Sequence, residues 1–209
     1  MNQDVNDPVY REIASQYDNE VREYSSYGHE VIFGMSFEFV RAGERLLDIG
    51  IGTGLASIHF SEVGLEVCGL DTSQEMLNAC RSKSFTEELK RCDIIREPIP
   101  YGDSSFDHVV CCGVLHFVKD LAALFSEVRR AMRSGGIFAF TIAPHETQAD
   151  CIEEQTAWGV PIFKHSLRYI MDLLERNGME LLKEQRVLMK GADKATFDML
   201  FSVLICRSG

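Results

Sequence analysis

Apolar residues gather in short blocks along the chain, and between about residues 45 and 143 these blocks alternate with segments of helical spacing. Near-continuous apolar runs of five to seven residues are typical of strands buried on both faces of a parallel sheet. The expected strands are Arg45 to Ile49, Glu66 to Asp71, Glu88 to Cys92, Phe106 to Cys112 and Ile137 to Ala143. The expected helices between them are Thr53 to Val63, a helix capped by Ser73, and Leu121 to Met132 closed by Gly135-Gly136. This alternation predicts a doubly wound α/β fold with helices on both faces of the sheet.

The two ends of the chain have a different pattern. Residues 8–24 place apolar side chains three and four positions apart, which predicts an amphipathic helix. Residues 144–164 have no clear periodicity, and a further helix is expected from Ser166 to Asn177. Two strands, at about 179–189 and 197–206, are separated by a short polar link, which favours an antiparallel hairpin at the edge of the sheet.

Length, charge and cysteine content narrow the function classes. The 209 residues suit one domain, and a formal charge of −11 disfavours a nucleic-acid substrate, since such binding depends on Lys and Arg. The chain contains no apolar run of the roughly 20 residues that would cross a bilayer, and its start is unlike a signal peptide. A cytoplasmic protein without membrane insertion is therefore expected. Seven cysteines without a C-x-x-C pair suggest neither disulfides nor a metal site.

The main chemical signal is a glycine loop directly after the first expected strand. Its sequence is Asp48-Ile49-Gly50-Ile51-Gly52-Thr53-Gly54. Glycines there let the backbone turn tightly and approach a ligand closely. In open α/β sheets ligands bind outside the carboxyl ends of the strands, so this loop marks the expected binding edge.

Two cofactor classes compete for such a loop. A nicotinamide dinucleotide requires G-x-G-x-x-G, but its third glycine would fall on Leu55. Asp48 would also repel a pyrophosphate, whereas a carboxylate suits the positively charged S-adenosylmethionine. A nicotinamide-dependent oxidoreductase therefore stays the weaker interpretation.

Three carboxylates follow three successive expected strands. Asp71 lies 23 residues after Asp48, and Asp93 lies 22 residues after Asp71. Asp48 would lie near the ammonium group of S-adenosylmethionine. Asp71 would accept both ribose hydroxyls, and Asp93 would accept the adenine amino group. One acid alone is usually a solvated loop residue, but three at these places favour a binding edge.

Four motifs together resemble class I S-adenosylmethionine-dependent methyltransferases, in particular the ubiquinone/menaquinone-biosynthesis type and small methyltransferase-like proteins. They are Leu46 to Gly54, Gly69 to Leu77, Cys92 to Ile94 with Pro98 to Asp107, and Arg133 to Gly136. The resemblance covers roughly residues 40–143 and implies a sheet order of 3-2-1-4-5-7-6 with strand seven antiparallel. Ile51 departs from the family pattern, in which a smaller residue or Cys is frequent.

The resemblance also implies positions for the cofactor, which leaves as S-adenosylhomocysteine. Its expected contacts, with the three acids and the loop glycines included, are Tyr17, Asp48, Gly50, Gly52, Gly54, Asp71, Thr72, Met76, Asp93, Ile94, Cys112 and Gly113. Residues 1–40 would form a helical lid, residues 41–143 the cofactor-binding core, and residues 144–209 the acceptor region with the C-terminal hairpin.

The acceptor side carries the least information. His116, just after the fourth expected strand, is the leading candidate base, with His145 and His29 behind it. Each of these histidines has packing in the fold as its simpler explanation. A small-molecule acceptor is expected, recognised by residues 8–40 and 144–165, including Trp158. A catalytically silent cofactor-binding partner or assembly protein stays an alternative, and the oligomeric state stays open.

Overall fold

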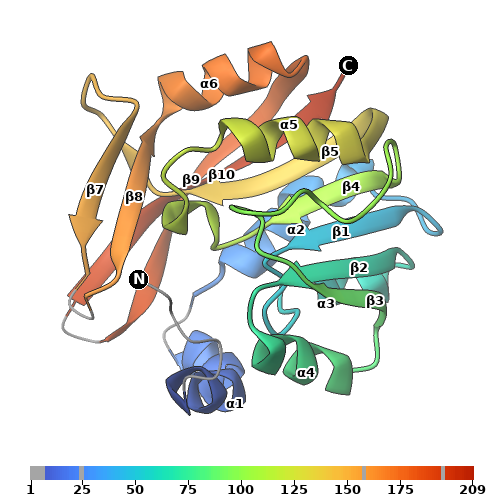
Figure 1. The fold of residues 1–209 in the computed structure, drawn as a ribbon, viewed down its shortest axis with the longest axis horizontal. Helices are drawn as coiled ribbons and strands as arrows, with labels where there is room; N and C mark the ends of the chain where they lie inside the picture. Colours follow the sequence, from blue (N-terminus) through green and yellow to red (C-terminus); the bar gives the residue numbers. More distant parts are fainter. Residues whose placement is uncertain (1–7, 24–25, 157–158, 194–195) are drawn as a thin grey trace.

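The structure is a computed structural model, and it describes residues 8–23, 26–156, 159–193 and 196–209 (Figure 1). Side chains are described for residues 16–23, 26–156, 159–188 and 200–209. The helices are α1 Pro8–Glu23, α2 Gly28–Ser36, α3 Ser57–Glu62, α4 Gln74–Ser82, α5 Ala122–Ala131 and α6 Leu167–Arg176, with 3-10 turns η1 Phe37–Phe39 and η2 Leu115–Phe117. The strands of the main sheet are β1 Arg45–Ile49, β2 Glu66–Asp71, β3 Thr86–Arg91, β4 Phe106–Cys111, β5 Met132–Ile142, β9 Met179–Asp193 and β10 Thr196–Ser208.

The seven-stranded sheet has the order β3-β2-β1-β4-β5-β10-β9. Strands β3, β2, β1, β4 and β5 run parallel, while β10 is antiparallel to both of its neighbours, β5 and β9. This arrangement confirms the expected fold, because the last strand inserts between the fifth and the sixth. The order reverses between β1 and β4, which both leave the sheet at the same edge.

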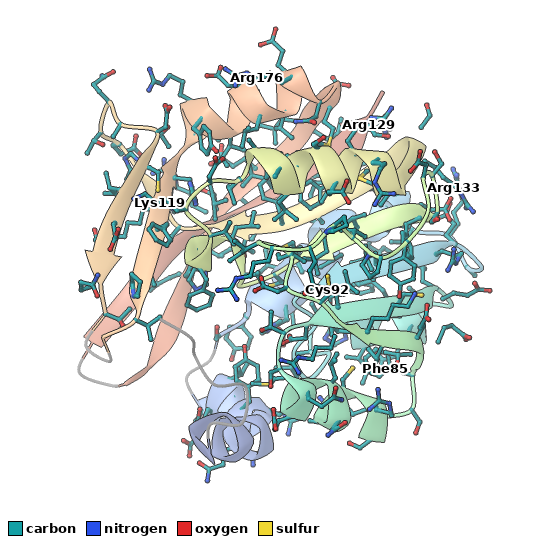
Figure 2. The ribbon with its side chains drawn as sticks, in the orientation of Figure 1. Phe85, Cys92, Lys119, Arg129, Arg133 and Arg176 are labelled. Atoms are coloured by element: carbon teal, nitrogen blue, oxygen red, sulfur yellow. The ribbon has the colours of Figure 1, made fainter. Side chains whose placement is uncertain are left out.

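Two apolar layers hold the sheet between helices (Figure 1). Successive side chains of a strand point to opposite faces of the sheet. Leu47 and Ile49 therefore point toward α5 and α6, while Leu46 packs on the side of α2, α3 and α4. Phe125 of α5 lies edge-on to two rings of β5, with centroids 5.5 and 5.4 Å away. Side chains fill the space between the helices and the sheet (Figure 2).

Two expected features were wrong. Helix α3 begins at Ser57 rather than Thr53, because the glycine loop continues through turns before the helix starts. Helix α5 ends at Ala131, and residues 133–136 form a register shift at the start of β5. The glycine pair therefore lies inside this irregular stretch of the strand and does not close the helix.

Residues 144–164, which have no clear periodicity in the sequence, contribute most of a second small sheet of order β6-β8-β7. Its strands are β6 Pro144–His145, β7 Cys151–Gln155 and β8 Pro161–Ser166. Most of their side chains are half-buried or exposed, so no alternation marked them in the sequence. This sheet and the β9–β10 hairpin extend past the carboxyl edge of the parallel strands (Figure 1).

Candidate functional site

The glycine loop is fixed to the end of the neighbouring strand. The amides of Gly50 and Ile51 both donate to the carbonyl oxygen of Leu70, at 2.7 and 2.9 Å. Gly50 has a φ of +71°, and a Cβ atom there would lie 2.3 Å from the Val114 side chain after β4. Both observations require glycine, since an L side chain would be strained and would clash.

Gly52 and Gly54 serve different purposes. The Gly52 amide donates to Asp71 Oδ2 at 2.8 Å, and a Cβ on Gly52 would meet no atom within 4 Å. This side of the loop is therefore open. A Cβ on Gly54 would lie 2.5 Å from Phe85 and 2.9 Å from the Cys80 sulfur, so this glycine allows close packing against α4 and β3.

Asp48 ends up buried at the base of the loop, with 2% of its surface exposed. The Ser57 hydroxyl donates to its Oδ2, whereas its Oδ1 is buried without a hydrogen-bond partner. Burial raises the pKa of Asp48 to about 7, the nearby Asp71 raises it further, and the Ser57 hydrogen bond opposes both. A buried acceptor of this kind calls for a donor or a cation.

A cavity of about 30 Å³ has Asp48 in its wall. Its walls are Tyr17, His29, Asp48, Gly50, Ile51, Gly52, Thr53, Leu55, Ala56 and Cys112. The volume is about that of one water molecule, far below the roughly 300 Å³ at which small-ligand pockets begin. A larger open hollow of about 760 Å³ lies between α2 and β9, but none of its lining residues belongs to the glycine loop.

Helix α1 covers the cavity and is bound to the core by one carboxylate. Asp18 Oδ1 accepts a hydrogen bond from the Thr53 hydroxyl at 2.6 Å, and its Oδ2 pairs with Lys83 Nζ at 2.5 Å. The neighbouring Tyr17 lines the cavity. Burial, with the nearby Cys112 as a smaller cause, raises the pKa of Tyr17 to about 12, so its hydroxyl is protonated.

The second acid receives hydrogen bonds on both oxygens. Asp71 Oδ1 accepts from the Ser73 amide at 2.8 Å, in addition to the Gly52 bond on Oδ2. Burial raises the pKa of Asp71, and these amide bonds oppose the rise. Each oxygen keeps a second lone pair for a ligand hydroxyl. Thr72 is exposed beside it, and Met76 is half-buried in the first turn of α4.

The third acid lies just after β3. Asp93 pairs with Arg96 at 3.4 Å, and it accepts from the Ile95 amide at 3.1 Å. Ile94 is half-buried and packs against the core. Asp71, Asp93 and Ile94 do not line the cavity, but they follow strands that end at the same edge.

The turn after β4 completes this edge. Cys112 lines the cavity, and burial, reinforced by Asp48, raises the pKa of its thiol well above the ordinary range. The Gly113 amide donates to the Thr141 hydroxyl at 2.8 Å, with φ at +73°. The turn is therefore held against β5.

His116 lies in η2, buried between aromatic rings. Its ring centroid is 4.1 Å from that of Phe117 and 5.3 Å from that of Phe201, and its Nδ1 has no hydrogen-bond partner. Burial lowers the pKa of His116 to about 4, and His165 lowers it further. His116 is therefore neutral near pH 7 and lies outside the cavity walls. His145, whose Nε2 is also buried without a partner, is the last residue of β6 in the second sheet.

Sequence reasoning gave little or no weight to several residues of the site. Ser57 was expected only as a helix residue, and Thr53 was expected in the glycine loop and at the start of the helix, without a partner of its own. His29 was ranked low because it looked like a packed histidine. Their roles depend on contacts between distant segments, such as Asp18 with Thr53, which no local pattern signals. Trp158 lies outside the described residues.

Two further properties concern the described residues only. Within the part of the chain that the structure describes, no three His, Cys, Asp or Glu side chains are grouped so that they could hold a metal ion. None of the described helices is long and apolar enough to span a membrane. Arg129 and Arg133 lie where α5 ends and β5 begins, at the edge opposite the glycine loop (Figure 2).

Comparison with known proteins finds similarity over the part of the chain that contains the glycine loop. Residues 47–140 match the family described as methyltransferase domain. A putative methyltransferase of Bacillus subtilis is 36% identical over 103 residues, which are 47% of this chain and 42% of that protein. Demethylmenaquinone methyltransferase of Oceanobacillus iheyensis is 32% identical over 139 residues, 61% of this chain and 57% of that protein. The chain thus matches about half the length of these curated relatives.

Solved structures agree on the fold. A crystal structure of an S-adenosylmethionine-dependent methyltransferase from Methanosarcina mazei superposes with a TM-score of 0.70 at 16% identity. The superposition covers 83% of this chain and 96% of that one. At this identity the likeness shows that the two chains share a fold.

Proposed function

With a class I S-adenosylmethionine-dependent methyltransferase domain at residues 47–140 as the premise, we propose that the chain transfers a methyl group from S-adenosylmethionine to a small-molecule acceptor. The cofactor supplies a methyl group on a positively charged sulfur. The acceptor's lone pair forms the new bond to the methyl carbon while the carbon–sulfur bond breaks, and the electron pair stays on the sulfur of S-adenosylhomocysteine. The protein's main task is to hold the three atoms in line.

The observation that carries the proposal is the unpartnered Oδ1 of buried Asp48, a residue that lines the same cavity as Gly52. A carboxylate in this position suits the ammonium group of the cofactor's amino-acid end, and the cation would satisfy the buried acceptor. A pyrophosphate would add negative charge next to Asp48. Asp48 therefore disfavours a dinucleotide, whereas Asp71 would suit the ribose of either cofactor.

The remaining contacts follow the strand ends in order. Asp71 has a free lone pair on each oxygen for the two ribose hydroxyls, with Thr72 and Met76 bordering them. Asp93 and Ile94 would meet the adenine ring. Gly50 and Gly113 keep the backbone turns that bring the loops of β1 and β4 together.

Helix α1 acts as a lid in this proposal. A cavity of about 30 Å³ cannot hold the cofactor, so Tyr17 and the adjoining helix must move before it binds. The contacts to be broken are those of Asp18 with Thr53 and Lys83. Closing them again over the bound cofactor would exclude water from the sulfonium.

We propose that residues 144–209 recognise the acceptor and that His116 lies on the acceptor side of the site. A histidine whose pKa is lowered to about 4 is a weak base, so it is poorly matched to abstracting a proton at neutral pH. Its unpartnered Nδ1 can instead orient the acceptor through a hydrogen bond. The expected result for His116→Phe is a higher KM for the acceptor with unchanged affinity for the cofactor.

A transfer experiment tests the acceptor class. Protein and tritiated-methyl S-adenosylmethionine are incubated with a cell extract that is separated by size afterwards, with Asp71→Ala as the control. Label in the small-molecule fraction, absent with the variant, supports the proposal. Label confined to macromolecules would contradict the acceptor class, and cofactor binding without any transfer would favour the silent partner protein.

A further inference from the structure

His29 is a buried polar side chain for which the fold provides no partner. It is the second residue of α2, its exposed fraction is 9%, and its Nδ1 has no hydrogen-bond partner. It lines the same cavity as Asp48, whose Oδ1 is also unpartnered. Two buried polar atoms left open at one small cavity indicate a ligand with both a donor and an acceptor.

Burial keeps the His29 ring neutral. Burial lowers the pKa of His29, with His59 and Lys83 acting in the same direction, while Glu30 and Asp18 oppose them. A neutral imidazole carries one N–H donor and one acceptor nitrogen. The ring can therefore donate a hydrogen bond without bringing a positive charge next to the ammonium group that we place at Asp48.

The amino-acid end of the proposed cofactor is a zwitterion, with a carboxylate beside the ammonium group. No Lys or Arg side chain is among the described residues that line the cavity. The side-chain donors there are the hydroxyls of Tyr17 and Thr53, the thiol of Cys112 and the His29 ring. Among the described residues of the cavity wall, these groups and the loop amides are available to the carboxylate.

Three of the four side chains are less suitable. The Thr53 hydroxyl already donates to Asp18, and a thiol such as that of Cys112 is a weak donor. Tyr17 belongs to the lid that must open. His29 differs because α2 packs on the sheet through Ile32, whose side chain is fully buried, so the ring is held in place before the ligand arrives.

We propose that His29 determines specificity for an α-amino-acid ligand by donating a hydrogen bond from Nδ1 to the carboxylate at the amino-acid end of the cofactor. Asp48 and His29 would then read the two charges of one zwitterion from two walls of the cavity. The inference rests on the proposed function and requires the tautomer with its proton on Nδ1.

The test compares two ligands that differ only in the carboxylate. Calorimetric titrations use S-adenosylhomocysteine and its decarboxylated analogue with the wild type, His29→Phe and His29→Asn. A hydrogen bond to a charged group corresponds to about a 10- to 100-fold change in affinity. His29→Phe should therefore lose about this factor for S-adenosylhomocysteine and less than about threefold for the analogue. His29→Asn, which keeps an N–H near the place of Nδ1, should recover part of the loss.

A matched control is His59→Phe, because His59 lies on α3, is partly exposed and contacts Glu62 outside the cavity. It should bind both ligands like the wild type. Equal losses of both ligands in His29→Phe would overturn the inference and leave His29 a packing residue. Failure of the wild type to bind either ligand would overturn the proposed function itself.

Discussion

Replacing Asp48 by Asn should stabilise the protein in a strongly pH-dependent way. The side chain is buried, and its pKa is raised to about 7 from 3.8. The unfolded chain therefore binds fewer protons than the folded one between these values, and the free energy of unfolding falls as the pH rises from about 4 to 7. Asparagine has the same shape and does not titrate, so the variant avoids this loss.

The magnitude follows from the shift. About three pKa units at 1.36 kcal/mol each amount to about 4 kcal/mol, fully developed above pH 7. About 2.5 kcal/mol of this difference develops between pH 5 and pH 8. For a protein of this size, 4 kcal/mol corresponds to roughly 8–16 °C in Tm.

Urea unfolding at several pH values between 5 and 8 measures the effect. The free energy of the variant minus that of the wild type should increase steadily with pH. Asp172→Asn, which removes an exposed carboxyl on α6, controls for the change in net charge. A difference between Asp48→Asn and the wild type that stays constant over this range would refute the reasoning. The variant should also lose affinity for S-adenosylhomocysteine, since its neutral amide oxygen can accept a hydrogen bond from an ammonium group but offers no opposite charge.

Four further results are expected. Binding of S-adenosylhomocysteine at pH 7 should release about half a proton from Asp48. The measured binding enthalpy should therefore change with the ionisation enthalpy of the buffer. A binding enthalpy that does not depend on the buffer would contradict the ammonium contact. Gly50→Ala should lower the free energy of unfolding by about 3 kcal/mol, because strain at positive φ adds to a clash. Gly52→Ala should lower it by about 1–2 kcal/mol, because strain is the only cost there. Equal urea midpoints for the two variants would contradict this difference. Lys83→Met should raise the stopped-flow release rate of S-adenosylhomocysteine about three- to tenfold, and an unchanged rate would remove the ion pair from the lid. Phe125→Ala should cost about 3–5 kcal/mol in urea unfolding, and a loss below 1 kcal/mol would contradict the packing between α5 and β5.

The parallel strands could be predicted because burial on both faces leaves an unbroken apolar run, as in Phe106–Cys111. Strands β7 and β8 could not, because they are short and half-exposed, so neither pattern develops. The glycine loop and the three acids follow from spacing along the chain. The ionisation states of the acids do not follow from this spacing, since the pKa of Asp48 depends on burial and on the position of Ser57.

Contacts between distant segments were also beyond sequence reasoning. The pairing of Asp18 with Thr53 joins residues 35 positions apart, and it fixes α1 over the cavity. The resemblance suggested that Tyr17 closes over the cofactor, and the structure places its side chain in the cavity wall. That this cavity has a volume of only about 30 Å³ follows from the three-dimensional packing of α1, α2 and the loop.

Calorimetric titration of the wild type and Asp71→Ala with S-adenosylhomocysteine and NADH tests the central claim most directly. The account predicts one S-adenosylhomocysteine bound per wild-type chain, no binding of NADH, and a loss of roughly tenfold or more in the variant, since Asp71 would bind the ribose and also holds Gly52. Thermal unfolding of the variant checks that it is folded. No binding of S-adenosylhomocysteine to the wild type, or tighter binding of NADH, would contradict the claim that this edge is an S-adenosylmethionine site.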